Sequence, residues 1–84
     1  SRLKIDRSFI ENVANDKDDQ AVTSAVISLG QNLNMRVVAE GVETAEQLRF
    51  LTDHNCDEAQ GHYYCKAVSP QALAQMLSEN DLTM

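Results

Sequence analysis

The sequence predicts an α/β fold in which short parallel strands alternate with helices. Two observations support this prediction. Short apolar segments alternate along the chain with segments whose apolar residues recur at helical spacing, and two of the helical segments begin with a capping signal. Strands that are joined through helices pair in parallel through right-handed crossovers. We therefore expect one small sheet with strands at roughly 2–5, 36–40 and 58–64.

The first strand candidate precedes a polar segment and then a helix. Residues 12–19 are rich in Asn, Asp and Lys, which predicts an exposed loop. A helix is expected from about Asp19 to Asn34, although Gly30 weakens this prediction. Its apolar residues recur at helical spacing, so one stripe of the helix should face the core; the stripe consists of Val22, Ala25, Val26, Leu29 and Leu33.

The second strand candidate, residues 36–40, is rich in β-branched residues and apolar at both alternating positions. This pattern is typical of a strand that is covered by helices on one face and by a barrel interior on the other. The helix after it begins with Thr44 and Gln47, which have the spacing of a capping box, and should end near residues 54–55. Its buried side should carry Leu48 and Leu51.

The third strand candidate, residues 58–64, is followed by the last helix. Ser69 supplies an N-cap, and Pro70 occupies the first helical position, where proline is well tolerated. The apolar residues of this helix are Leu73, Met76 and Leu77.

Composition limits the classes of function. The chain has 84 residues, 43% of them hydrophobic, with three Gly and one Pro, which favours one soluble globular unit with a small core. Its net charge of −6 argues against a surface that binds nucleic acid or an anionic membrane. No apolar run approaches the roughly 18 residues of a membrane span, and no charged-plus-apolar leader opens the chain. We expect a cytoplasmic protein.

Two histidines and two cysteines lie in one short segment, which raises the question of a zinc site. The spacing of His54, Cys56, His62 and Cys65 matches none of the common paired zinc patterns, so packing or surface roles are favoured. Without a secretory signal, the two cysteines are expected to be reduced rather than bridged.

Polar residues stand where each strand candidate ends. Lys4 lies in a Lys-Ile-Asp run, Glu40 follows three apolar residues, and Gln60 precedes Gly61. A carboxylate at the mouth of a sheet is costly unless a cation or metal meets it, which makes Glu40 the strongest candidate. Each of the others has a structural alternative. Lys4 alone fits a solvated residue on an edge strand, Gln60 a partner of a loop backbone, and Glu43 equally a residue that stabilises the next helix through its dipole.

Together the three segments resemble the EAL family of bacterial cyclic-di-GMP phosphodiesterases. The matching residues are Lys4 in Lys-Ile-Asp, Glu40 and Glu43 in Glu-Gly-Val-Glu, and Gln60 in Gln-Gly, with matching flanks at 6–10 and 57–59. The resemblance covers essentially the whole chain. It implies a modified (β/α)8 barrel of TIM type, of which residues 1–84 form a C-terminal fragment with about the last three strand–helix units.

The resemblance also implies an activity, namely hydrolysis of cyclic di-GMP to linear pGpG with two Mg²⁺ or Mn²⁺ ions. Two ions suit this reaction because one activates water while both neutralise charge on the phosphoryl group. By resemblance, Glu40 is a ligand of the second metal and Lys4 positions the attacking water. Gln60 belongs to the same water network, and Glu43 is a supporting residue.

The chain departs from the family pattern in two respects. Where the family usually has an aromatic and then a Phe-Ser-Lys/Arg-Pro-like run, this chain has His62, Tyr64, Cys65, Lys66 and Ala67, so the rim that contacts guanine should be altered. The 84 residues also lack the segments that supply most metal ligands in the family. These are the Glu-Ala-Leu strand, the Asn and Glu strands after it, and an Asp-Asp pair before the sixth strand, which residues 2–5 resemble.

We therefore expect an active complete domain and an inactive isolated chain. One alternative is a degenerate domain that binds cyclic di-GMP or a protein partner without hydrolysis; another is an autonomous three-unit α/β domain.

Open strand edges and an apolar inner face around Ile5, Val38 and Tyr64 predict a homodimer or larger assembly. The helix at Asp19–Asn34 also lies in a region that resembles the family's dimer surface. Other domains could tether the complete protein to a membrane.

Overall fold

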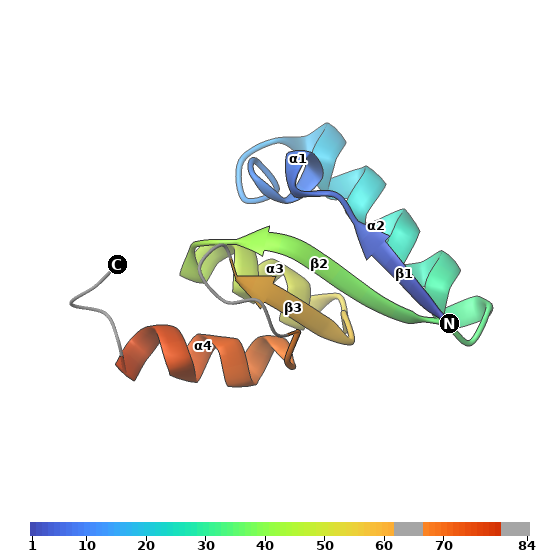
Figure 1. The fold of residues 1–84 in the computed structure, drawn as a ribbon. Coiled ribbons are helices and arrows are strands. Elements are labelled where there is room, and N and C mark those ends of the chain that lie inside the picture. The colour runs from blue at the N-terminus through green and yellow to red at the C-terminus, as the bar shows by residue number, and fades with distance from the viewer. Residues whose placement is uncertain (62–66, 80–84) are drawn as a thin grey trace.

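Three strands and four helices alternate along the residues that the computed structural model describes, 1–61 and 67–79 (Figure 1). In chain order they are β1 (Arg2–Ile5), α1 (Arg7–Ile10), α2 (Lys17–Asn32), β2 (Arg36–Val42), α3 (Ala45–Asp53), β3 (Glu58–Gly61) and α4 (Pro70–Glu79). The strands form one sheet in the order β1-β2-β3, and both pairings are parallel. The predicted α/β fold with parallel strands is confirmed.

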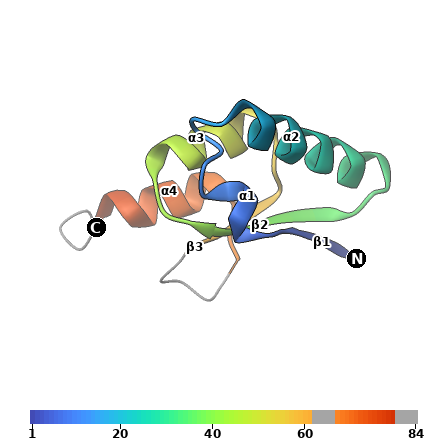
Figure 2. The same cartoon turned by 90° about the horizontal axis from the view of Figure 1, so that it is seen from above.

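The helices α2 and α3 cover one face of the sheet (Figure 2). Side chains that alternate along the strands, such as Ile5, Val37 and Ala39, point into the core between the sheet and these helices. The rest of the core comes from the helices and from β3, namely Ile10, Ile27, Leu48, Leu51, Ala59 and Leu73, with Val42 and Cys56. The alternate strand positions therefore belong to the opposite face. The predicted apolar inner face is wrong in two residues, because Ile5 lies in the core beneath the helices and Val38, on the opposite face, is fully buried; Tyr64 lies outside the described residues.

Both predicted capping signals are confirmed. The Thr44 side chain accepts a hydrogen bond from Gln47 N, and the Gln47 side chain accepts one from Thr44 N, so α3 begins with a complete capping box. At α4, Ser69 Oγ accepts a hydrogen bond from Ala72 N at 3.1 Å. Of the predicted apolar residues of α4, Leu73 is fully buried and Met76 is partly buried, while the side chain of Leu77 lies outside the described part of the chain.

The prediction of an exposed loop at residues 12–19 is partly wrong. Asp16 is an N-cap whose carboxylate accepts hydrogen bonds from Asp18 N and Asp19 N, so α2 begins at Lys17. Val13, in the same polar segment, is fully buried. The acidic residues that suggested a loop serve instead as the cap and first turn of a helix, where negative charge is favourable.

The predicted buried stripe of α2 is largely wrong, because Val26 is the one residue of the five that packs against the core. The helix faces the sheet with Thr23, Ile27 and Gly30, whereas Leu29 and Leu33 are 52% and 57% exposed and Val22 is exposed as well. A Cβ at Gly30 would overlap the Val37 side chain, so the missing side chain allows α2 to approach β2 closely. The buried face of α2 is therefore the one that lies nearest to β2. The exposed face carries more large apolar residues.

Several smaller features complete the fold. The short helix α1 was not predicted; Asp6 caps it by accepting hydrogen bonds from both N and Oγ of Ser8. β2 extends beyond residue 40 to Val42. The structure describes β3 over Glu58–Gly61, and the predicted strand residues 62–64 lie outside the described residues. Within the described residues, no helix combines the length and apolar character that crossing a membrane requires.

Candidate functional site

The sheet brings the first two predicted site residues together. Lys4 on β1 is in register with the fully buried Val38 on β2, and Glu40 follows two residues later, so both side chains project from the face of the sheet opposite α2 and α3. The distance from Lys4 Nζ to Glu40 Oε2 is 3.8 Å. The structure thus pairs the Glu40 carboxylate with a cation at the carboxyl ends of neighbouring parallel strands, where α/β folds carry their sites.

This ion pair is partly open to solvent. The side chains of Lys4 and Glu40 are 60% and 35% exposed. An exposed pair of this kind stabilises a fold by only about 0–1 kcal/mol, because water screens the attraction. Both groups can therefore exchange partners at low energetic cost. A carboxylate that accepts a divalent cation and an ammonium that orients an anion or a water molecule both need this freedom.

Glu43 occupies a different position from Glu40, because β2 changes its geometry between them. The register between β2 and β3 shifts between Ala39 and Val42, and Gly41 has a left-handed φ of 71°. A Cβ at Gly41 would overlap the side chain of Arg7, so a larger residue is excluded there. Glu43 itself is exposed and immediately precedes the N-cap of α3. From this position Glu43 can support the site at the end of β2, and its negative charge can also stabilise the N-terminus of α3.

Gln60 lies on β3, next to β2 in the sheet. Along β3 the partly buried Glu58 and Gln60 alternate with the buried Ala59 and Gly61. Since Ala59 belongs to the core under the helices, Gln60 projects from the same face as Lys4 and Glu40. Three strands thus contribute one predicted residue each to one face of the sheet.

A hard divalent cation fits the chemistry of Glu40 but needs further ligands. Mg²⁺ is bound through carboxylate and other oxygen atoms, usually with one or two protein carboxylates. Within residues 1–61 and 67–79, no group of three or more His, Cys, Asp or Glu side chains could hold a metal ion. The described residues therefore offer Glu40 as one ligand of a larger coordination shell.

The opposite end of the same face carries a charged cluster that sequence reasoning missed. Glu58 Oε1 lies 3.4 Å from an Arg2 guanidinium nitrogen and 3.6 Å from Arg36 Nε, which connects all three strands. Asp57 Oδ2 accepts a hydrogen bond from Val37 N at 2.8 Å in the same region. These contacts lie where the strands begin, away from Lys4 and Glu40, and they fix the register of the sheet. The only signal in the sequence is that all three strand candidates begin near a charged residue.

The geometry of His54 and Cys56 favours the structural role predicted for them. His54 Nδ1 lies 2.9 Å from Phe50 O, and its ring stacks on the Phe50 ring with centroids 4.0 Å apart. Cys56 is a buried free thiol, and burial raises its pKa to about 11, which disfavours the thiolate that zinc would require. His62 and Cys65 lie outside the described residues, so the predictions for them stay predictions.

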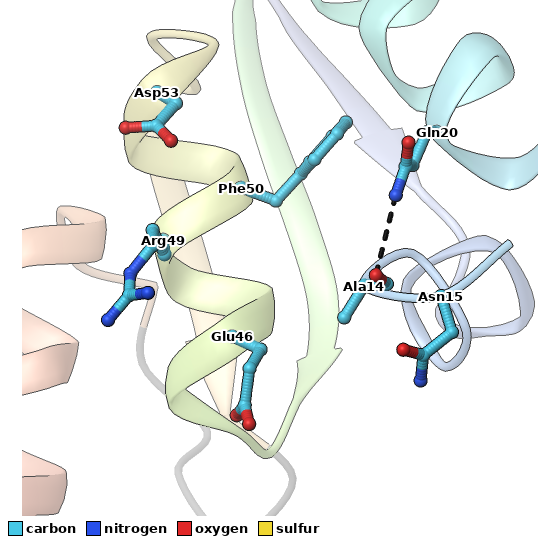
Figure 3. A pocket seen from close by; sticks show the side chains of 7 residues that line it. All are labelled: Ala14, Asn15, Gln20, Glu46, Arg49, Phe50 and Asp53. Carbon is cyan, nitrogen blue, oxygen red and sulfur yellow. Dashed lines mark hydrogen bonds between the residues drawn. The ribbon is translucent and has the colours of Figure 1, made fainter. Parts of the chain in front are cut away.

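A shallow pocket of about 270 Å³ lies on the helical side of the sheet, between α3 and the segment that leads into α2 (Figure 3). Phe50 points from α3 toward α2 across it, and Gln20 donates a hydrogen bond to Ala14 O at its edge. The other lining residues are Asn15, Glu46, Arg49 and Asp53. None of the predicted site residues lines this pocket, so the candidate site is the opposite face of the sheet, which carries Lys4, Glu40 and Gln60.

Comparison with known proteins agrees with this reading. A sequence profile described as "EAL domain" matches residues 1–67. The chain is 54% identical over 61 residues to the bifunctional diguanylate cyclase/cyclic di-GMP phosphodiesterase MucR of Pseudomonas aeruginosa, covering 73% of this chain and 9% of that protein. The chain spans about a tenth of the length of the curated relatives that it matches.

Solved structures show the same relationship at the level of the fold. A structure described as the PaMucR phosphodiesterase in complex with c-di-GMP superposes with a TM-score of 0.71 at 46% identity, covering 87% of this chain and 30% of that one. The EAL domain of Mycobacterium smegmatis DcpA gives a TM-score of 0.71 at 34% identity, covering 94% and 35%. The three parallel strand–helix units thus match part of a TIM-type barrel domain, as predicted. The chain belongs to the EAL domain family.

Proposed function

We propose that this chain contributes Lys4 and Glu40 to the site of a cyclic-di-GMP phosphodiesterase, and that the complete domain hydrolyses cyclic di-GMP to linear pGpG. The observation that carries the proposal is the 3.8 Å pairing of Lys4 Nζ with Glu40 Oε2 on the face of the sheet opposite α2 and α3. Membership of the EAL family and the names of the relatives support it. We also propose that the protein works in the cytoplasm.

Each residue has a defined role in the proposed reaction. Glu40 supplies an anionic oxygen ligand to one of two Mg²⁺ or Mn²⁺ ions, and Lys4 orients the attacking water beside it. Gln60, on the same face, hydrogen-bonds in the water network, and Glu43, just after the end of β2, is a supporting residue. When bound, the metal ions supply an activated water and neutralise charge on the phosphoryl group.

The 84-residue chain alone should be inactive. Glu40 is one carboxylate, and two divalent cations that each keep an octahedral shell require several more ligands. We expect no pGpG and no tight Mn²⁺ binding from the purified chain. Addition of the complementary N-terminal part of a complete domain should restore hydrolysis through reassembly of the barrel, provided that this part retains its carboxylates.

The test compares three substitutions in the complete or reassembled domain. Glu40→Gln removes a ligand charge at nearly constant size, and Lys4→Ala removes the ammonium; each should lower kcat by at least about 100-fold. Glu43→Gln should have a smaller effect. Glu46→Gln, an exposed glutamate in the first turn of α3, is the matched control and should retain full activity. The measurement is pGpG formation, separated chromatographically, at saturating Mn²⁺.

Two outcomes would contradict the proposal. Equal turnover of the unaltered protein and Glu40→Gln would rule out the metal-ligand role. A complete domain that binds cyclic di-GMP at equilibrium but produces no pGpG would establish the alternative, a receptor that has lost hydrolysis.

A further inference from the structure

Gln47 is a buried polar residue that joins three separate segments of the chain. Its side chain is on α3, and the residue is only 5% exposed. Its Oε1 accepts hydrogen bonds from Glu43 N at 2.6 Å and from Thr44 N at 3.0 Å. Its Nε2 donates to Glu11 O at 3.3 Å. Burial of an amide is costly unless such bonds are made, so all three partners matter to the fold.

Two of these bonds go beyond what a helix cap requires. A capping box consists of the Gln47 side chain on Thr44 N and the Thr44 side chain on Gln47 N, which are separated by 3.0 Å and 3.1 Å here. The bond from Glu43 N is additional and shorter. The bond to Glu11 O joins residues that are 36 positions apart and has no part in capping.

The additional bonds connect the two chain segments that follow the site strands. Glu11 is the C-cap of α1, which begins directly after β1 and Lys4. Glu43 lies directly after β2, which carries Glu40. A second contact links the same segments, because the Arg7 side chain lies where a Cβ of Gly41 would be. The carboxyl ends of β1 and β2 are therefore held together beyond the last ladder pair, Ile5 with Ala39.

We propose that Gln47 is a positioning residue of the proposed phosphodiesterase site. Its amide holds Glu43, at the end of β2, against Glu11, at the end of α1, and so sets the position of the β2 backbone that carries Glu40 relative to β1, which carries Lys4. Gln47 contacts neither side chain of the pair directly. This role rests on the proposed function, because it acts through the residues that the proposal makes functional.

We call the bonds of the Gln47 side chain to Glu43 N and Glu11 O the clamp. The test separates the loss of this clamp from the loss of the helix cap in the complete domain. In Gln47→Glu, the carboxylate still accepts from Glu43 N and Thr44 N and still completes a capping box, but it cannot donate to Glu11 O. In Thr44→Ala, the matched control, the side-chain half of the cap is lost while the bond to Glu11 O is retained. Mn²⁺ affinity is measured by titration calorimetry, and amide exchange by mass spectrometry with hydrogen–deuterium labelling.

The two variants should give opposite patterns. Gln47→Glu should weaken Mn²⁺ binding by about 10- to 100-fold, as the loss of a group that orients a metal ligand typically does, and should accelerate exchange in residues 11–16. Thr44→Ala should bind Mn²⁺ within about twofold of the unaltered protein and should accelerate exchange only at the start of α3. Gln47→Met, which removes all three side-chain bonds at similar size, should show both effects.

Wild-type Mn²⁺ affinity and wild-type exchange in Gln47→Glu would overturn the proposal, since Gln47 would then be only a cap. Equal Mn²⁺ losses in Gln47→Glu and Thr44→Ala would overturn it as well. If Gln47→Glu does not fold, the same comparison of Gln47→Met with Thr44→Ala decides. A domain that binds Mn²⁺ with the predicted pattern but does not hydrolyse cyclic di-GMP contradicts the proposed function and leaves the clamp established.

Discussion

At the scale of single residues, Cys56 shows how burial changes the chemistry of a side chain. Its Sγ lies 3.6 Å from Val37 O and 3.3 Å from Glu58 O, so the thiol donates within the space between β2 and β3. Burial raises its pKa to about 11. A thiolate there would lose its hydration and face two carbonyl oxygens. The thiol therefore stays protonated and acts as a small apolar group.

This shift predicts a dependence of stability on alkaline pH. Above the ordinary thiol pKa the unfolded chain releases the Cys56 proton, whereas the folded chain keeps it up to about pH 11. The free energy of unfolding should therefore fall as the pH rises through this window, with a contribution from Cys56 of up to about 2 kcal/mol. Urea denaturation at pH 8 to 10.5, at one protein concentration, measures it. The Cys56→Ala variant, which lacks the thiol, should show a shallower profile, and parallel profiles would contradict the prediction.

The sequence placed Lys4 and Glu40 near the ends of their strands, but it predicted neither their ion pair nor the contact between Gln47 and Glu11, for a physical reason. Lys4 and Glu40 end apolar strands, and their position at the sheet edge follows from local sequence together with the topology. Gln47 was identified as a capping residue because Thr44 lies at the right spacing. Its contact with Glu11 depends on how α1 and α3 pack, and no pattern along the chain encodes that distance.

At the scale of elements, α2 shows that close approach can decide which face of a helix is buried. Gly30 and Ile27 lie against the sheet, while Leu29 and Leu33 remain exposed. A sequence pattern counts apolar residues on each stripe of a helix but does not measure how near the helix comes to its neighbour. The capping signals of α3 and α4 were predicted correctly because each depends on residues within one turn.

The packing of α2 predicts an unusual response to Gly30→Ala. Alanine normally stabilises a helix interior by about 1 kcal/mol relative to glycine. Here the added Cβ would overlap Val37, a stiff β-branched residue of β2, so α2 must move away from the sheet. We expect a net loss of about 1–3 kcal/mol in the free energy of unfolding, measured by urea denaturation.

The matched control for this prediction is Ser28→Ala on the exposed face of the same helix. It should stabilise the chain by about 0.5 kcal/mol, because propensity alone acts there. A stabilising Gly30→Ala would show that α2 and β2 can separate without cost and would contradict the close packing.

At the scale of the whole molecule, the described chain leaves two kinds of surface uncovered. The sheet order β1-β2-β3 makes β1 and β3 edge strands in the described residues, although an antiparallel bridge between Ala59 and Val68 covers part of the outer edge of β3. The stripe of α2 exposes Val22, Leu29 and Leu33. Open strand edges and contiguous apolar surface both favour association.

We therefore predict that the 84-residue chain self-associates into a dimer or larger assembly, because a monomer of this size buries little apolar surface. Sedimentation equilibrium at micromolar concentration should show species heavier than the 9.3 kDa monomer. The double variant Leu29→Gln, Leu33→Gln should weaken association at least about tenfold if the α2 stripe forms the contact, since two exposed leucines would lose their burial. Ala74→Gln, at an exposed position on α4, is the control and should leave association unchanged. Association that persists in the double variant would assign the contact to the edges of β1 and β3, and a cooperatively unfolding monomer would contradict the prediction altogether.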